Sequence, residues 1–452
     1  MGRGTEERGR RSGPPPGVRS TVACLLWTLA TGVVLGVKSA RPALGVETVP
    51  MQVLQPLHTL GVMCFLFCGT ITLASMAIRR ASGRYPRTAG AATAGMTAFF
   101  ALAGGAIAAG KGSGLEYVPW PIALTAVPVL ALVATACAAW RHLGGLSAIS
   151  AEGSWLLLMG LCLAPLGLLE RAAGSGAMGP ARALMIEWHA LDMVFAGVNT
   201  ALYGLGTLLS APAGRGRALR GRWLYALAVL ALLSTFGHHH YLSPQPLALK
   251  VIAFGASMLG LLSFLRHVAM VRRSLAAPAG GAGAPLLLAA SLWTLFAVGS
   301  GVLLAIPQLN LVLHGTHAIV GHSMGAIIGV NVAIVLGGLL GERRAGEAPR
   351  PAGPIRSAAW LFNAALALMV LDLLAAGLVK GVVRVGDTHH AYQPLVRSIL
   401  APLPVLGLVL AGATVRLSVL ALRRPSMLGR TTATAEPATE RTIELAAPVE
   451  SA

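Results

Sequence analysis

The feature that most constrains this chain is a long series of apolar runs, separated by short polar or basic segments. A run of about 20 apolar residues is long enough to span a bilayer as a helix. Hydrophobic residues make up 55% of the 452 residues, charged residues make up 11%, and the mean hydropathy is +0.71. Soluble domains of this length do not have such a composition. The sequence therefore predicts an all-α polytopic membrane protein.

About twelve transmembrane helices are expected, in a membrane domain that spans residues 19–424. The segment 1–18 is basic and resembles the start of a signal peptide. The first apolar run is long and no clear cleavage site follows it, so an uncleaved anchor is expected. The tail 425–452 is polar, and we expect it to be disordered and cytoplasmic. The predicted helices cover 19–38, 53–78, 87–110, 118–140, 153–172, 182–211, 223–242, 247–271, 284–307, 309–341, 356–380 and 392–422.

The basic residues indicate orientation. With the N-terminus in the cytoplasm, Arg clusters such as 79–87 and 215–222 fall on the inner side, whereas few basic residues fall outside. This asymmetry favours an even number of helices with both termini in the cytoplasm. The net charge of +19 does not indicate nucleic-acid binding, because the Arg clusters punctuate apolar runs and form no continuous basic face. The five Cys residues lie in apolar stretches, and we expect buried thiols.

Histidines gather near one end of the predicted helices. His58, His189, the pair His238 and His239, and His322 come from four separate helices. With the topology above, all of them fall in the outer third of the membrane. Ionisable side chains are costly in lipid and mark functional sites, and histidine is the commonest metal ligand. The layer therefore predicts a metal-binding cluster.

His238 and His239 are adjacent, so they cannot share one face of a regular helix. Both can bind one metal where the helix ends and the backbone relaxes. A third imidazole from His189 would complete a three-nitrogen site with an open position, which suits copper or non-heme iron. His240 could replace either neighbour. The alternative is a hydrated loop with unrelated histidines.

His322 and Met324 point about 200° apart on one helix, at 100° per residue. One helix can thus present a ligand to each of two hemes on its opposite sides. His322 would bind one heme, and Met324 would bind the other with His58 on its far side. The alternative for Met324 is ordinary packing.

These motifs resemble those of the heme–copper oxidase superfamily. The string His314-Gly-Thr-His317-Ala-Ile-Val-Gly-His322-Ser-Met324 is similar to the tenth-helix motif H-D-T-x-x-V-x-A-H-x-H. The resemblance implies that His314 lies near heme propionates and that His322 binds the high-spin heme. Met324 departs from the second axial histidine of the family. The run from His238 to Pro246 is similar to that of cbb-type oxidases and nitric oxide reductases.

The resemblance also assigns the remaining candidates. It implies that His189 binds the non-heme metal and that His58 binds the low-spin heme. Family members that reduce oxygen carry a tyrosine either four residues after the helix 6 histidine, where this chain has Met193, or in helix 7 near 231–235, where none occurs. Nitric oxide reductases lack it and place a carboxylate one turn after that histidine. Asp192 is a loose match; the alternative is a carboxylate that hydrogen-bonds within the bundle.

The expected activity is therefore reduction of nitric oxide to nitrous oxide in a bacterial inner membrane, with an atypical cbb-type oxygen reductase as the runner-up. The implied cofactors are a low-spin heme b, a high-spin heme b and one non-heme iron or copper. Arg384 and Arg397 would pair with heme propionates; the alternative is ordinary interfacial residues. No CxxCH motif occurs, so electrons are expected from a cytochrome c-type subunit or a quinol. A transporter or sensor with structural histidines is the hypothesis from another class.

Overall fold

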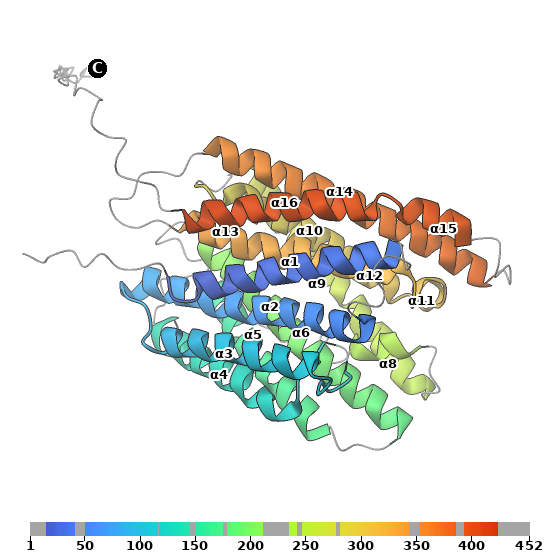
Figure 1. Cartoon of the computed structure of the whole chain (residues 1–452), viewed down its shortest axis with the longest axis horizontal. Helices are drawn as coiled ribbons and strands as arrows, with labels where there is room; N and C mark the ends of the chain where they lie inside the picture. Colours follow the sequence, from blue (N-terminus) through green and yellow to red (C-terminus); the bar gives the residue numbers. More distant parts are fainter. Residues whose placement is uncertain are drawn as a thin grey trace, which may run out of the picture.

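The computed structural model describes residues 15–40, 50–115, 117–143, 151–174, 179–210, 235–241, 246–276, 281–342, 352–385 and 393–423. These residues are nearly all helical, and none of them lies in a β-strand (Figure 1). Eleven helices in this part of the chain are long and apolar enough to cross a membrane. The predicted all-α polytopic class is confirmed. The twelfth predicted helix, 223–242, lies outside the described residues except for 235–241, as does the whole tail 425–452.

The helices lie side by side along the long axis of the molecule (Figure 1). The first half contains α1 (Val18–Ala40), α2 (Met51–Ser82), α3 (Thr88–Ala108), the 3-10 turn η1 (Ile122–Thr125), α4 (Ala126–Leu143), α5 (Ala151–Ala173) and α6 (Pro180–Ser210). The second half contains the 3-10 helix η3 (Thr235–His240), α8 (Leu247–Met258), α9 (Gly260–Ala276), α10 (Ala284–Leu304), α11 (Pro307–Leu313), α12 (His317–Met324), the π-helix η4 (Gly325–Val332), α13 (Ala333–Gly341), α14 (Ala352–Val385), α15 (Gln393–Leu400) and α16 (Leu403–Leu422).

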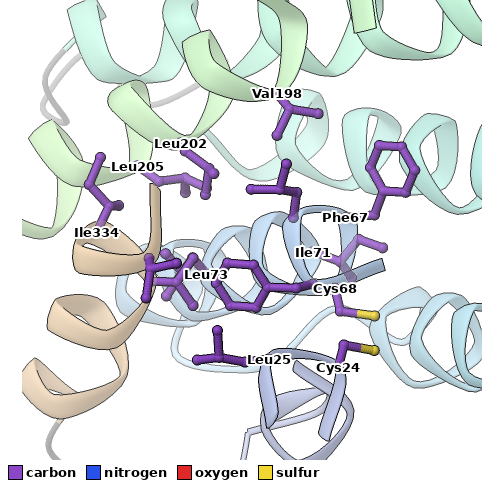
Figure 2. Close-up of a cluster of buried hydrophobic side chains, with 14 of the residues drawn as sticks. Cys24, Leu25, Phe67, Cys68, Ile71, Leu73, Val198, Leu202, Leu205 and Ile334 are labelled. Atoms are coloured by element: carbon purple, nitrogen blue, oxygen red, sulfur yellow. The ribbon is translucent and has the colours of Figure 1, made fainter. Parts of the chain in front are cut away.

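Helix α2 forms the centre of the core. Its apolar side chains meet α1, α6 and α13, as Figure 2 shows for Phe67, Leu202 and Ile334. The first and last helices also touch, because α1 packs on α16. Cys24, Cys64 and Cys68 are buried in this core, as expected. The expectation was wrong for Cys137 and Cys162, which are exposed on the lipid side of α4 and α5.

Helices α5 and α6 approach closely because small residues recur where they meet. Gly153, Gly160 and Gly167 on α5 are spaced seven apart and face Gly197 and Gly204 on α6. A Cβ added to Gly167 would lie 2.6 Å from the carbonyl oxygen of Ala190. Such small residues let membrane helices pack backbone to backbone. This packing places the end of α5 against the beginning of α6.

The predicted helix 309–341 is wrong as a single helix. Its first part ends after Leu313, because Gly315 adopts a left-handed conformation with φ of +69°. Thr316 then caps α12 by accepting a hydrogen bond from the amide of Ala318 at 3.2 Å. Glycine and threonine are the residues that typically end and begin helices. The helix predicted over 247–271 is likewise interrupted, at Leu259, and the helix predicted over 392–422 at 401–402.

The α-helix also changes to a π-helix directly after Met324. The π-helix η4 covers eight residues in the middle of the span His317–Gly341. Two of its residues, Gly325 and Gly329, leave room for the rings of Phe296 and Trp293 on α10. Long π-helical segments are rare and are frequently found at functional sites.

Candidate functional site

One end of the bundle carries most of the histidines singled out above. Successive helices alternate in direction, so the starts of α2, α6 and α12 lie at the same end as η3. Figure 1 shows α8, α11 and α15 at that end. This region, with His58, His189, His238, His239, His314 and His322, is named the histidine end below. His58 lies about two turns inside α2, one turn deeper than expected, and His322 lies in the second turn of α12.

His189 on α6 has a carboxylate partner that sequence reasoning missed. Its Nδ1 lies 2.7 Å from Oε1 of Glu170 and 2.9 Å from Oε2, so Nδ1–H donates to the carboxylate. Glu170 stands on α5, three residues after Gly167, where the two backbones approach. The seven-residue glycine spacing was the signal that could have revealed this pair. A carboxylate on one ring nitrogen is the usual support for a metal-binding histidine.

His238 and His239 lie in the 3-10 helix η3, which ends at His240. Their ring centroids are 4.2 Å apart and the rings are tilted by 32°. The Nδ1 atom of His238 lies 3.2 Å from Oγ of Ser257. Because that hydroxyl donates its own proton to the carbonyl of Ala253, it accepts from His238. Ser257 of α8 therefore orients the ring of His238.

Asp192 lies between His189 and the pair on η3. One of its carboxylate oxygens is 3.9 Å from Nε2 of His239. The two side chains are each about a quarter exposed. Asp192 follows His189 by three residues on the same face of α6, as the sequence suggested. The carboxylate is thus within reach of the predicted metal ligands.

His322 is supported by a serine from α10. Its Nδ1 lies 2.8 Å from Oγ of Ser300, and that hydroxyl donates its proton to the carbonyl of Phe296 at 2.6 Å. Ser300 therefore accepts from Nδ1–H of His322. A Cβ on Gly301 would lie 3.4 Å from the imidazole, so the glycine leaves space beside the ring. Sequence reasoning missed Ser300, because nothing local links it to a histidine on another helix.

His58 is supported by α1. Its Nδ1 donates to the carbonyl oxygen of Thr28 at 3.1 Å, and Oγ1 of Thr31 lies 3.2 Å away. Gly32 makes room for the ring, because a Cβ there would lie 3.0 Å from the imidazole carbon Cε1. Met324, the predicted partner of His58 on the low-spin heme, packs half-buried against the apolar core.

Four histidines thus share one arrangement. In His58, His189, His238 and His322 the Nδ1 proton is held by an oxygen acceptor that has no proton to give back. When such a ring is neutral, its lone pair lies on Nε2. A histidine of this kind is oriented and ready to bind a metal or heme iron. The arrangement fits the ligand roles expected for these residues.

His314 lies in the turn between α11 and α12. Its ring centroid is 6.4 Å from that of His239, and its Nδ1 atom is buried without a hydrogen-bond partner. Burial, followed by the neighbouring guanidinium of Arg384, lowers the pKa of His314 and keeps the ring neutral. Arg384 donates to the carbonyl oxygens of His314 at 3.0 Å and Val312 at 3.2 Å, and also to that of Leu311. It therefore holds the end of α11, while Arg397 is exposed on α15.

The three predicted metal donors are not gathered around one point. Within the described ranges, no group of three or more His, Cys, Asp and Glu side chains could hold a metal ion. His189 is instead paired with Glu170, and His239 lies beside Asp192. The donor types, imidazole nitrogens with neighbouring carboxylates, are of a kind that suits an iron or copper ion. The side chain of His240 lies outside the described part.

No protein-family model matches the sequence, and no curated protein matches it. Solved structures do match. One, presented as the cryo-EM structure of a heme–copper terminal oxidase dimer, has a TM-score of 0.69 and 14% sequence identity. The match covers 91% of this chain and 84% of that one. This chain shares its fold with a heme–copper terminal oxidase. The expected fold, that of a heme–copper oxidase subunit I-like bundle, is confirmed.

Proposed function

We propose that this protein is a multi-pass membrane oxidoreductase that reduces two molecules of nitric oxide to nitrous oxide. The observation that carries the proposal is the shared orientation of four histidines, His58, His189, His238 and His322, each with Nδ1 beside an oxygen acceptor. In this proposal two hemes b and a non-heme iron or copper, when bound, supply the redox chemistry. The chain resides in a bacterial inner membrane with both termini in the cytoplasm.

The residues divide the ligand roles as follows. His322 binds the high-spin heme, and His58 with Met324 binds the low-spin heme through which electrons enter. His189, His238 and His239 hold the non-heme metal. His314, Arg384 and Arg397 stand near the propionates; Arg384 is also engaged with the end of α11, so it contacts them with its remaining donor capacity. A cytochrome c-type subunit or a quinol donates the electrons.

The reaction consumes protons as well as electrons. Two nitric oxide molecules, two electrons and two protons give one nitrous oxide and one water. Asp192 and Glu170 stand beside the histidines that would hold the metal, at 3.9 Å and 2.7 Å from ring nitrogens. Carboxyl groups at such positions can transfer protons to a reacting group. We assign proton delivery to Asp192, and orientation of His189 to Glu170.

The tyrosines favour nitric oxide over dioxygen. Family members that cleave dioxygen use a tyrosine joined to a metal-binding histidine. Here Tyr241 donates its hydroxyl to the carbonyl of Ala305 at 3.1 Å. Tyr203 hydrogen-bonds His267 at 2.8 Å, about three turns along α6 from Asp192. Both hydroxyls are thus engaged away from the predicted metal ligand His189.

An atypical oxygen reductase is the second candidate, favoured by the fold shared with a terminal oxidase. A transporter or sensor with structural histidines is the third. Nitric oxide reduction and oxygen reduction both require heme, whereas a transporter or sensor does not. A purified sample without a Soret band would therefore favour the transporter or sensor.

The deciding experiment measures nitric oxide and oxygen consumption by the purified full chain with an artificial electron donor. We expect nitric oxide consumption that disappears in His189→Ala. Rapid oxygen turnover without nitric oxide turnover would overturn the proposal in favour of the oxygen reductase.

A further inference from the structure

Asp372 is a carboxyl group inside the apolar helix α14, next to Leu373, which meets Gly321 of α12. At 1.5 Å per residue it lies about 20 Å from the Val385 end of the helix and about 30 Å from the Ala352 end. Its Oδ2 atom is buried and has no hydrogen-bond partner within the described part of the chain. An unpaired carboxyl group at this depth is costly, so intramembrane acids normally have a partner.

The carboxyl group borders an apolar face of α14 that no described helix covers. Asp372 itself is half-buried between Leu371 and Leu373. The face that packs on α12 is a different one, since Gly321 of α12 meets Leu373 and Gly377 of α14 meets Ala318. The exposed side chains recur at helical spacing and are Trp360, Leu361, Leu368, Leu371, Leu378 and Val382. Lipid chains can cover the apolar side chains of this face, but they supply no hydrogen-bond donor to the carboxyl group of Asp372.

We propose that this face of α14 binds a transmembrane helix of a partner subunit that carries one Lys or Arg at the depth of Asp372. The partner residue is a cation because Lys and Arg supply both a countercharge and hydrogen-bond donors to the carboxyl group. The apolar stripe supplies the packing surface on either side of the pair. The proposal does not depend on which gas the protein reduces.

A second copy of this chain fits the face less well. A two-fold axis along the membrane normal would bring equal depths together and so place one Asp372 near the other. The exposed cation nearest in the fold, Arg416 on α16, lies about 10 Å from the Leu422 end. Asp372 lies about 30 Å from the corresponding end of α14, so the two depths do not match.

The test uses the full chain reconstituted in phosphatidylcholine vesicles with fluorescently labelled peptides. One peptide is an apolar 21-residue helix with a central Lys, and its match carries Leu at that position. Energy transfer to the labelled protein reports binding. We expect the Lys peptide to bind about tenfold more tightly than the Leu peptide, in line with a polar contact between membrane helices.

Two variants make the result specific. Asp372→Asn is expected to remove the preference for the Lys peptide, and Leu371→Ala, on the same face, is expected to retain it. Circular dichroism melting checks that both variants fold. Equal binding of the two peptides to the unmodified chain, or a preference that survives in Asp372→Asn, overturns the proposal. A dimer that becomes monomeric in Asp372→Asn would identify a second copy as the occupant and also overturn it.

Discussion

Histidines at the two ends of the bundle differ in what their ring nitrogens do. At the end opposite the histidine end, His267 on α9 uses both nitrogens: Nδ1 accepts from the hydroxyl of Tyr203 at 2.8 Å, and Nε2 donates to the carbonyl of Ser291 at 2.7 Å. His322 uses Nδ1 with Ser300, and no hydrogen bond is found for its Nε2. Burial alone does not separate the two residues. The two residues differ in the number of ring nitrogens that form hydrogen bonds, and this number distinguishes a structural histidine from a candidate ligand.

The surroundings differ in the same way. Around His267 the ionisable groups are paired, because Arg266 and Glu152 form an ion pair at 2.8 Å. At the histidine end, ring nitrogens of His314 and His317 are buried without a hydrogen-bond partner among the described residues, whereas the orphaned atom near Glu152 is the hydroxyl oxygen of Ser154. Buried polar atoms without partners are rare in folded proteins and each needs an explanation, such as a missing ligand or ion. We therefore propose binding at the histidine end and scaffolding at the other.

The largest expected effect compares His322→Ala with His267→Ala. We expect His322→Ala to lose the high-spin heme, which is half of the heme in the purified protein, and His267→Ala to retain both hemes. Loss of His267 leaves the hydroxyl of Tyr203 with only the weak sulfur acceptor of Met270 at 3.3 Å, and it removes the donor to the carbonyl of Ser291. Hydrogen bonds lost in this way cost about 1–3 kcal/mol each. The substitution should therefore lower the melting temperature. Pyridine hemochromogen assays and thermal melts measure the two effects, and equal heme loss in both variants would contradict the distinction.

A second pair of variants sharpens the assignment at α2. His58→Ala is expected to abolish the low-spin α-band in reduced spectra. Thr31→Val removes the weaker neighbour of Nδ1 but leaves the carbonyl of Thr28 as its acceptor, so the band should persist. An intact low-spin band in His58→Ala would show that another residue binds that heme. Met324→Leu provides the same test on the other side of the ring.

A third pair concerns the two glutamates of α5. Glu170→Gln is expected to weaken binding of the non-heme metal by about 10–100-fold, because it replaces the acceptor that orients His189. Glu152→Gln, at the opposite end of the same helix, should leave metal content unchanged. Elemental analysis after dialysis against a chelator measures both. Equal metal loss in the two variants would rule out a specific role for Glu170.

The smallest effect is expected for Ser300→Ala. The heme should remain, because Nε2 of His322 is unaffected. The iron–histidine vibration should shift to lower frequency, since Nδ1 loses its acceptor and the ring becomes a weaker donor to the metal. Thr294→Ala on the same helix is the control, because Thr294 hydrogen-bonds only the carbonyl of Ala290 among the described residues. An unchanged resonance Raman band in Ser300→Ala would show that Ser300 does not affect the bond between His322 and the heme iron.

The sequence alone predicted the candidate ligands, because ionisable side chains are rare in membrane-spanning helices. An imidazole in an apolar run stands out, so His58, His189 and His322 could be placed at one end before the fold was known. The residues that hydrogen-bond these histidines could not be predicted, because Glu170 and Ser300 come from other helices and reach them only through the packing of the bundle. The glycines of α5 carried that packing information in their spacing. The break at Gly315 was missed because a continuous apolar pattern outweighed two clear capping residues.

The central claim, which rests on the proposed function, is that the oriented imidazoles at the histidine end bind iron porphyrin and a non-heme metal. Heme and metal content of one purified, unmodified sample test it most directly, with the reduced-minus-oxidised spectrum taken from the same tube. The account predicts a Soret band, two hemes b and one non-heme iron or copper per chain. A stable, fully helical sample with neither Soret absorbance nor stoichiometric metal would contradict it.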